Sequence, residues 1–268
     1  MYSIDMRTAH LPHPLGLQLP GVAAAPPSAT NWPGVWRGDA WLAPTYPALA
    51  SGHPVLDKAL PGGGWPQGQL TELLHPAGQH AEWRLLLPAL ALAARSGPVL
   101  LVGPPHSPNL HALAAQGLPS ERLWRVDADT PAHRLWATEQ ALRCPDLAAA
   151  VVWLPLAQPE PLRRLHTLAQ SAVHAGTGLS APLLFAWRPL AARSTASPAP
   201  LRLQVESLGL QGLRVDVFKR RGPPLERPLT LAAPLPLHQL VNPLGQPATW
   251  AELPANRHVV DRPGRLAA

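Results

Sequence analysis

"GGGWPQGQLTELLHPAGQHAEWRLLLPAL", residues 62–90, has the outline of a phosphate-binding loop with its flanking elements. A glycine-rich turn at 62–64 precedes an apolar run that predicts a short strand over Leu70–Leu74. A loop containing Pro76 and Gly78 follows, and then an apolar segment that predicts a helix over Glu82–Ser96. Strand, tight loop and helix in this order are the setting in which a nucleotide's phosphates are bound.

The loop itself lacks the residues that this chemistry needs. A working phosphate loop has the pattern G-x-x-x-x-G-K-[ST], and the corresponding residues, His75–Glu82, are HPAGQHAE. Histidines replace both glycines, Ala81 replaces the lysine that neutralises phosphate oxygens, and Glu82 replaces the hydroxyl residue that holds magnesium. We therefore expect a degenerate phosphate loop, formed by His75, Gly78, His80, Ala81 and Glu82, that binds no nucleotide cofactor.

Around this loop, apolar runs alternate with helical segments. Further strands are predicted over 97–103, 123–126, 147–155 and 181–189, and helices over 107–118, 130–145 and 159–176. Pro88 should bend the helix at 82–96 or delay its start. Alternating residues at 201–205 and 213–218 predict an antiparallel hairpin, and 227–233 predicts one more edge strand. The fold class is therefore α/β, a mostly parallel sheet flanked by helices with an appended antiparallel hairpin.

Composition limits the other possibilities. The chain has 268 residues with 22 Lys+Arg against 16 Asp+Glu, and its net charge of +6 permits nucleic-acid contact without demonstrating it. The lone Cys144 excludes an internal disulfide and a multi-cysteine zinc site. The apolar stretches are too short to span a bilayer and the N-terminus makes a poor signal peptide, so we expect a cytoplasmic protein with no membrane contact.

Thirty-six prolines mark the edges of the folded part. We expect a flexible Pro/Ala-rich tail over residues 1–30, one domain over 31–240, and a C-terminal extension over 241–268 that binds a partner.

The segment "SGHPVLDKALPGGGWPQGQLTELL", residues 51–74, resembles the entry to a RecA-type ATPase core. The resemblance rests on the Leu56-Asp57 pair, the glycines 62–64 and the Pro66-Gln67-Gly68 step. Together with "VWRGDA" before it and "VDVFKRRG" after it, the segment looks most like the ImuA family, RecA-like proteins associated with damage-induced (SOS) translesion DNA synthesis in bacteria. The similarity covers roughly residues 34–232, so the domain at 31–240 is expected to be a degenerate RecA-like domain.

This resemblance implies a non-catalytic accessory or scaffold protein of a mutasome. The implied partners are a polymerase-like translesion subunit and a replicative-type error-prone polymerase, with RecA and single-stranded DNA as further candidates and self-association also open. In a RecA-type core, the strand matching 147–155 ends in an aspartate that supports magnesium, but this chain has Trp153 there and no carboxylate before Glu160. The strand at 97–103, followed in relatives by a catalytic glutamate, continues into Pro104 and Pro105.

Two other functions remain open. An ATP-dependent recombinase-type protein would have to use an unorthodox loop, and a SulA-type division inhibitor would share the loss of nucleotide chemistry. A zinc site is not expected, because the pairs His75/His80, His106/His111 and His166/His174 lack the i, i+4 spacing of a helical metal site. Catalytic and metal residues are therefore predicted to be absent.

Basic residues and tryptophans are the candidates for contacts with DNA or with partner proteins. The densest basic cluster is "FKRRG" at 218–222, which predicts contacts with DNA phosphates or with an acidic partner. A solvated strand end with no binding role explains the same residues equally well. Trp124, Trp153 and Trp187 are expected in the core, whereas tryptophans outside it are candidates for a partner surface. The candidate DNA or partner contacts are Arg214, Lys219, Arg220, Arg221 and Arg227, and the candidate partner surface is Trp36, Trp41 and Trp250, with Trp32 beside them.

Overall fold

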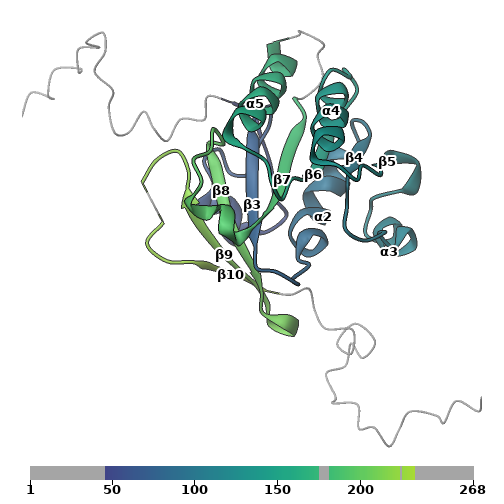
Figure 1. Cartoon of the computed structure of the whole chain (residues 1–268). Coiled ribbons are helices and arrows are strands. Elements are labelled where there is room, and N and C mark those ends of the chain that lie inside the picture. Colours follow the sequence, from purple (N-terminus) through teal and green to yellow (C-terminus); the bar gives the residue numbers. More distant parts are fainter. Residues whose placement is uncertain (1–45, 175–180, 224, 233–268) are drawn as a thin grey trace, which may run out of the picture. The chain divides into compact units, whose positions relative to one another are not determined.

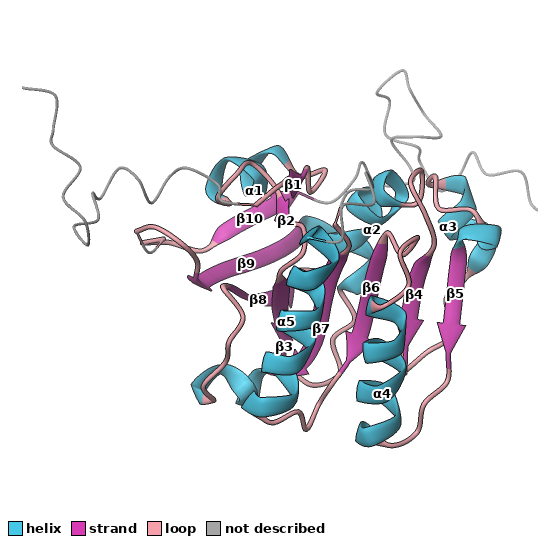
Figure 2. Ribbon diagram, turned by 90° about the horizontal axis from the view of Figure 1, so that it is seen from above, coloured by secondary structure: helices cyan, strands magenta, loops and turns pink. Residues whose placement is uncertain are grey.

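Eight strands form the central sheet of the protein, whose structure is a computed structural model. The structure describes residues 46–174, 181–223 and 225–232. In chain order the central strands are β3 (Leu70–His75), β4 (Val99–Val102), β5 (Leu123–Val126), β6 (Ala149–Trp153), β7 (Leu183–Pro189), β8 (Leu201–Ser207), β9 (Gly212–Lys219) and β10 (Leu229–Ala232). In space their order is β10-β9-β8-β3-β7-β6-β4-β5, which Figure 2 shows across the whole sheet.

The strands from β8 to β5 are parallel to one another, whereas β9 pairs antiparallel with β8 and β10 pairs antiparallel with β9. This confirms the predicted α/β fold, the hairpin and the final edge strand. The strand β3, which leads into the degenerate phosphate loop, lies inside the sheet between β7 and β8.

Helices cover both faces of the sheet (Figures 1 and 2). One face carries α4 (Pro131–Leu142) and α5 (Pro159–His174); the other carries α1 (Pro54–Ala59), α2 (Glu82–Ala93) and α3 (Leu110–Ala115). Each face has its own apolar cluster, because side chains of successive strand residues point to opposite sides. Leu73 packs on the α2 side, for example, and Leu70 on the α5 side.

Local sequence signals explain where several helices begin. The side chain of Asn109 caps α3 by accepting a hydrogen bond from the Ala112 N–H, and Thr130 caps α4 in the same way through His133. Pro131 occupies the first turn of α4, where its missing N–H costs nothing. Pro88 lies inside α2, and the helix still begins at Glu82, so the start is not delayed.

The segment that carries the RecA-type resemblance contains α1, which lies in the chain between two short strands, β1 (Ala48–Leu49) and β2 (Trp65–Pro66). These two strands pair antiparallel, and we call this small ribbon the clasp. The carboxylate of Asp57 accepts a 2.7 Å hydrogen bond from the backbone N–H of Ser51. Gly64 lies so close to β1 that an added Cβ would be 2.1 Å from the Leu49 carbonyl oxygen, so the third glycine of the motif is required for packing.

One expectation for the aromatic residues is wrong. Trp124 was expected in the core, but it is 49% exposed, because it lies on β5, which has one neighbour among the described strands of the sheet. Trp136 on α4 is also exposed, at 65%. Trp153 and Trp187 are buried as expected.

Candidate functional site

The degenerate phosphate loop connects the end of β3 at His75 to the start of α2 at Glu82. It therefore lies at the carboxyl ends of the parallel strands, where open α/β sheets bind their ligands. Gly78 has φ +73°, the left-handed conformation that allows the tight turn, and an added Cβ there would contact nothing within 4 Å. The loop keeps the geometry of a strand–turn–helix unit.

The residues in the lysine and hydroxyl positions are buried. Ala81 is 2% exposed, belongs to the apolar cluster on the α2 face, and precedes the helix without a side-chain capping bond. Glu82 is 8% exposed, with its Oε1 3.5 Å from Nδ1 of His80. The start of α2 thus presents a methyl group and a carboxylate where a phosphate loop presents a cation and a hydroxyl.

Neighbouring elements fix the loop in place. The side-chain oxygen of Gln79 accepts a 2.7 Å hydrogen bond from the Ser207 N–H at the end of β8. The ring of His75 packs edge-on against Trp187, with 5.4 Å between ring centroids, and its Nδ1 lies 3.0 Å from the Pro76 oxygen. On the other side, the ring of His80 contacts His106, which follows β4. The contacts of Gln79 with Ser207, His75 with Trp187 and His80 with His106 each join segments far apart in the chain, so no local pattern predicts them.

Arg134 on α4 lies near the carboxyl ends of β4, β5 and β6. The Arg134 guanidinium donates from Nε to the Ala128 carbonyl at 2.8 Å and from Nη1 to the Trp153 carbonyl at 2.9 Å. An added Cβ on Gly103, at the end of β4, would be 2.5 Å from Nε of Arg134. Arg134 therefore links the end of β6 to the segment after β5 and lies beside the end of β4, at the edge where the RecA-type resemblance would place a magnesium-supporting aspartate. Sequence reasoning missed this residue, since one arginine on an amphipathic helix carries no motif.

A buried ionic cluster lies inside the sheet, on the α5 face. The carboxylate of Glu72 on β3 is fully buried and accepts from Arg188 Nη1 at 3.2 Å and from Arg202 Nε at 2.7 Å. The Ser197 hydroxyl donates to the same carboxylate at 2.5 Å. Nε of Arg188 is buried without a partner. The sequence signals were a single charged residue in each of the apolar strands β3 and β7, and an arginine in the alternating strand β8.

The predicted basic contacts separate in space. Lys219, at the end of β9, donates from Nζ to the Ser197 carbonyl at 2.8 Å, whereas Arg220 donates to the Pro223 and Ala59 carbonyls, the latter on α1. The guanidinium of Arg221 lies 6.0 Å from the ring centroid of Tyr46. Arg227 is exposed in the segment before β10. Lys219, Arg220 and Arg221 thus contact different segments of the chain, and their role in binding DNA or a partner stays a prediction.

Burial lowers the pKa of Lys219, the positive charge of Arg202 lowers it further, and the carboxylate of Glu72 acts in the opposite direction.

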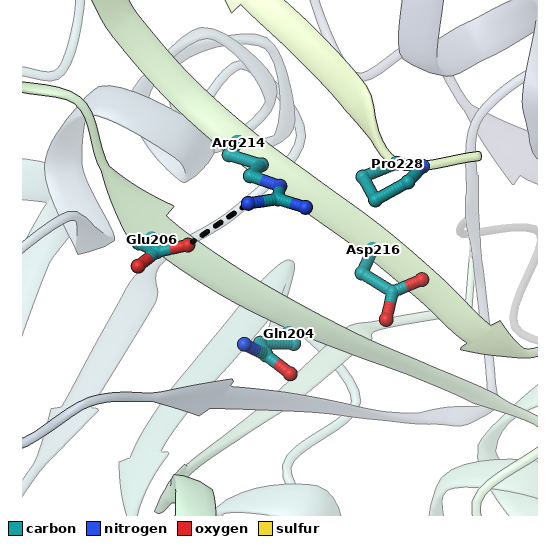
Figure 3. Close-up of a pocket in the computed structure, with 5 residues that line it drawn as sticks. All are labelled: Gln204, Glu206, Arg214, Asp216 and Pro228. Atoms are coloured by element: carbon teal, nitrogen blue, oxygen red, sulfur yellow. Dashed lines mark ion pairs between the residues drawn. The ribbon is translucent and has the colours of Figure 1, made fainter.

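The fifth predicted basic residue, Arg214, lines a hollow of about 110 Å³ on β8 and β9 (Figure 3). Its Nη1 lies 4.0 Å from Oε2 of Glu206, and Asp216, Gln204 and Pro228 complete the wall. Arg193 binds both Gln204 at 2.5 Å and Asp216 at 2.9 Å. Positive and negative groups therefore lie side by side here, with Glu206 beside Arg214 and Arg193 bound to Asp216.

Some predicted residues lie outside the described part of the chain. These are Trp32, Trp36, Trp41 and Trp250, together with the tail at 1–30 and the extension at 241–268. Within the described ranges, no three or more His, Cys, Asp and Glu side chains gather around a shared metal position. None of the helices in those ranges has the length and apolarity to cross a bilayer.

No protein-family model matches the chain, and no curated protein matches it either.

Proposed function

We propose that the protein is a non-catalytic, RecA-like accessory protein of a damage-induced translesion DNA synthesis complex, working in the cytoplasm. The observation that carries this proposal is the start of α2: a strand–loop–helix unit of the nucleotide-binding type has a buried Ala81 and a buried Glu82 in its two chemically essential positions. Its role is then to bind proteins, chiefly a polymerase-like translesion subunit and an error-prone replicative-type polymerase, with RecA and single-stranded DNA as further candidate partners.

The assignment to the RecA-like type is part of the proposal. It is supported by the entry segment at 51–74, whose motif residues are used structurally: Leu56 is fully buried, Asp57 accepts the Ser51 N–H, and Gly64 packs against β1. A mostly parallel sheet with the loop strand β3 in its interior and an antiparallel extension on one side agrees with it.

Electrostatic repulsion at the loop supports the proposal that the protein binds no nucleotide. A carboxylate at Glu82 repels a triphosphate, and partial burial strengthens that repulsion because the local dielectric is lower than in water. The described part of the loop, 75–82, contains no lysine or arginine to offset it. Arg134, the nearby cation identified above, is already bound to two backbone carbonyls.

Co-purification with the polymerase-like subunit tests the proposal. The full chain should form a stable complex that survives Ala81→Lys, since the loop plays no part in it, and that weakens when residues 241–268 are removed. Failure of the full chain to associate with that subunit in the presence of the other polymerase and of DNA would contradict the proposal. Filamentation on overexpression with direct binding to a cytoskeletal GTPase would instead support the division-inhibitor function.

A further inference from the structure

Two histidines from different loops meet beside the degenerate phosphate loop. His80 precedes α2, and His106 follows β4, although β7 and β6 lie between β3 and β4 in the sheet. Their Nε2 atoms are 3.2 Å apart, their ring centroids are 4.6 Å apart, and the ring planes make an angle of 76°. The two Nε2 atoms therefore lie in contact at the carboxyl edge of the sheet.

We propose that His80 and His106 together bind a divalent transition-metal ion of the zinc type. Zinc–imidazole bonds are about 2.0–2.1 Å long and structural zinc is tetrahedral, so two ligand nitrogens on one ion lie roughly 3.3 Å apart. The observed 3.2 Å separation of the Nε2 atoms is close to this value. A hydrogen bond between the same nitrogens holds the pair together in the metal-free protein.

Glu82 provides the accompanying carboxylate. Metal-binding histidines commonly direct their second ring nitrogen at a carboxylate, which fixes the ring orientation and leaves the other nitrogen free for the ion. Nδ1 of His80 lies 3.5 Å from Oε1 of Glu82, whose side chain is only 11% exposed and so is held in place by its surroundings. The side chain of His80 is 47% exposed, so an ion in solution can reach it. Glu82, which replaces the magnesium-binding hydroxyl residue of a phosphate loop, thus orients a histidine that binds a different cation.

The ligand atoms at the site determine which metal ions it binds. Since no third His, Cys, Asp or Glu among the described residues joins the pair around one position, water completes the coordination. Imidazole nitrogens suit Zn²⁺, Cu²⁺ and Ni²⁺, whereas Mg²⁺ takes oxygen ligands and keeps several of its waters. The ion would link the loop after β3 to the loop after β4 and so stiffen the carboxyl edge of the sheet. This inference is independent of the proposed function, because it concerns a metal without a nucleotide.

Calorimetric titration of the full chain with Zn²⁺ tests the proposal. The protein has 12 histidines, so the decisive comparison is between variants and not the total bound. We expect His80→Ala and His106→Ala each to lose the same one equivalent of Zn²⁺ that the unmodified chain binds. The matched control is His111→Ala, which removes an exposed histidine on α3 close to His106 and should retain that equivalent. Mg²⁺ should give no binding heat in any of them.

Thermal unfolding provides a second readout that does not depend on stoichiometry. Since an ion that binds only the folded state raises the melting temperature, Zn²⁺ should stabilise the unmodified chain and His111→Ala more than the two site variants. The proposal is overturned if the unmodified chain binds no Zn²⁺, if both site variants bind as it does, or if only one of them loses the equivalent, because the site requires both nitrogens.

Discussion

The guanidinium of Arg202 on β8 donates from Nε to Oε2 of Glu72 on β3 at 2.7 Å, inside the sheet where the glutamate is fully buried. Arg188 on β7 approaches the same carboxylate from the opposite side at 3.2 Å. One buried anion therefore connects three adjacent parallel strands through their side chains as well as through their backbone ladders. The strand that leads into the degenerate phosphate loop is at the centre of this arrangement.

Glu72→Gln should strongly destabilise the fold. The substitution leaves two buried arginines without their counter-charge, and removing one partner of a buried ion pair costs about 3–5 kcal/mol. Urea denaturation measures this as a lower midpoint with an unchanged slope. Glu160→Gln is the control: its pair with Arg163 joins side chains that are 69% and 63% exposed, and its loss should cost less than about 1 kcal/mol. Equal stabilities for the two variants would contradict the role of the cluster.

His166 on α5 should make stability depend on pH. Its Nδ1 accepts a hydrogen bond from the Leu70 N–H at 3.2 Å, which requires the neutral ring at that nitrogen. Burial lowers the pKa of His166 below its usual value of 6.5, and the nearby Lys219 lowers it further. The unfolded chain therefore takes up the proton first, so this contribution to stability is present above about pH 6.5 and is lost as the pH falls through that value towards the folded pKa.

The measurement is the free energy of unfolding between pH 7.5 and 5 for the original chain and for His166→Gln. The variant should show a shallower loss of stability on acidification, whereas His133→Gln, which removes an exposed ring on α4, should leave the slope unchanged. An identical slope for His166→Gln would contradict the assignment.

Gly64→Ala should disrupt the clasp formed by β1 and β2. The new methyl group would lie 2.1 Å from the Leu49 oxygen and 2.9 Å from the Ala50 nitrogen, both backbone atoms that can move only with the ribbon. Gly78→Ala provides the matched control, because its methyl group meets nothing and only the φ of +73° is strained, at a cost of about 1–2 kcal/mol. Thermal unfolding should rank Gly64→Ala as clearly the less stable of the two, and the reverse order would refute the packing role of the motif.

Single-stranded DNA binding, if it is part of the function, should depend more on Arg227 than on Arg214. Arg227 is exposed before β10, whereas Arg214 lies 4.0 Å from the Glu206 carboxylate in the hollow of Figure 3. Arg227→Ala should weaken binding and reduce the salt dependence by about one phosphate contact. Fluorescence anisotropy at several salt concentrations measures both effects, with Arg163→Ala on α5 as the control. A larger effect from Arg214→Ala would reverse this interpretation of the surface.

The fold was predictable because its signals are local. Strands β4 and β6 are continuous apolar runs, Thr130-Pro131 marks the start of α4, and alternation at 201–205 and 213–218 gives the hairpin. Trp124 shows where this reasoning fails: strand composition does not say which strand lies at the sheet edge, and β5 has a neighbour on one side only.

The site was predictable only in part. The missing lysine and hydroxyl follow from aligning His75–Glu82 with the motif, since each motif position has a defined chemical role. The contacts that hold the loop join residues far apart in the chain, as in Gln79 with Ser207 and His80 with His106. The contacts of the basic "FKRRG" residues also join distant segments, since Lys219 bonds Ser197 and Arg220 bonds Ala59, and whether these residues bind DNA or a partner stays a prediction.

Titration of the purified full chain with ATP and Mg²⁺ determines whether the degenerate phosphate loop binds nucleotide. Because Ala81 and Glu82 are buried at the start of α2, we expect no saturable heat of binding up to millimolar nucleotide and no phosphate release on adding DNA. Saturable micromolar ATP binding that is weakened by substitutions in His75–Glu82 would contradict it and would favour an ATP-dependent recombinase.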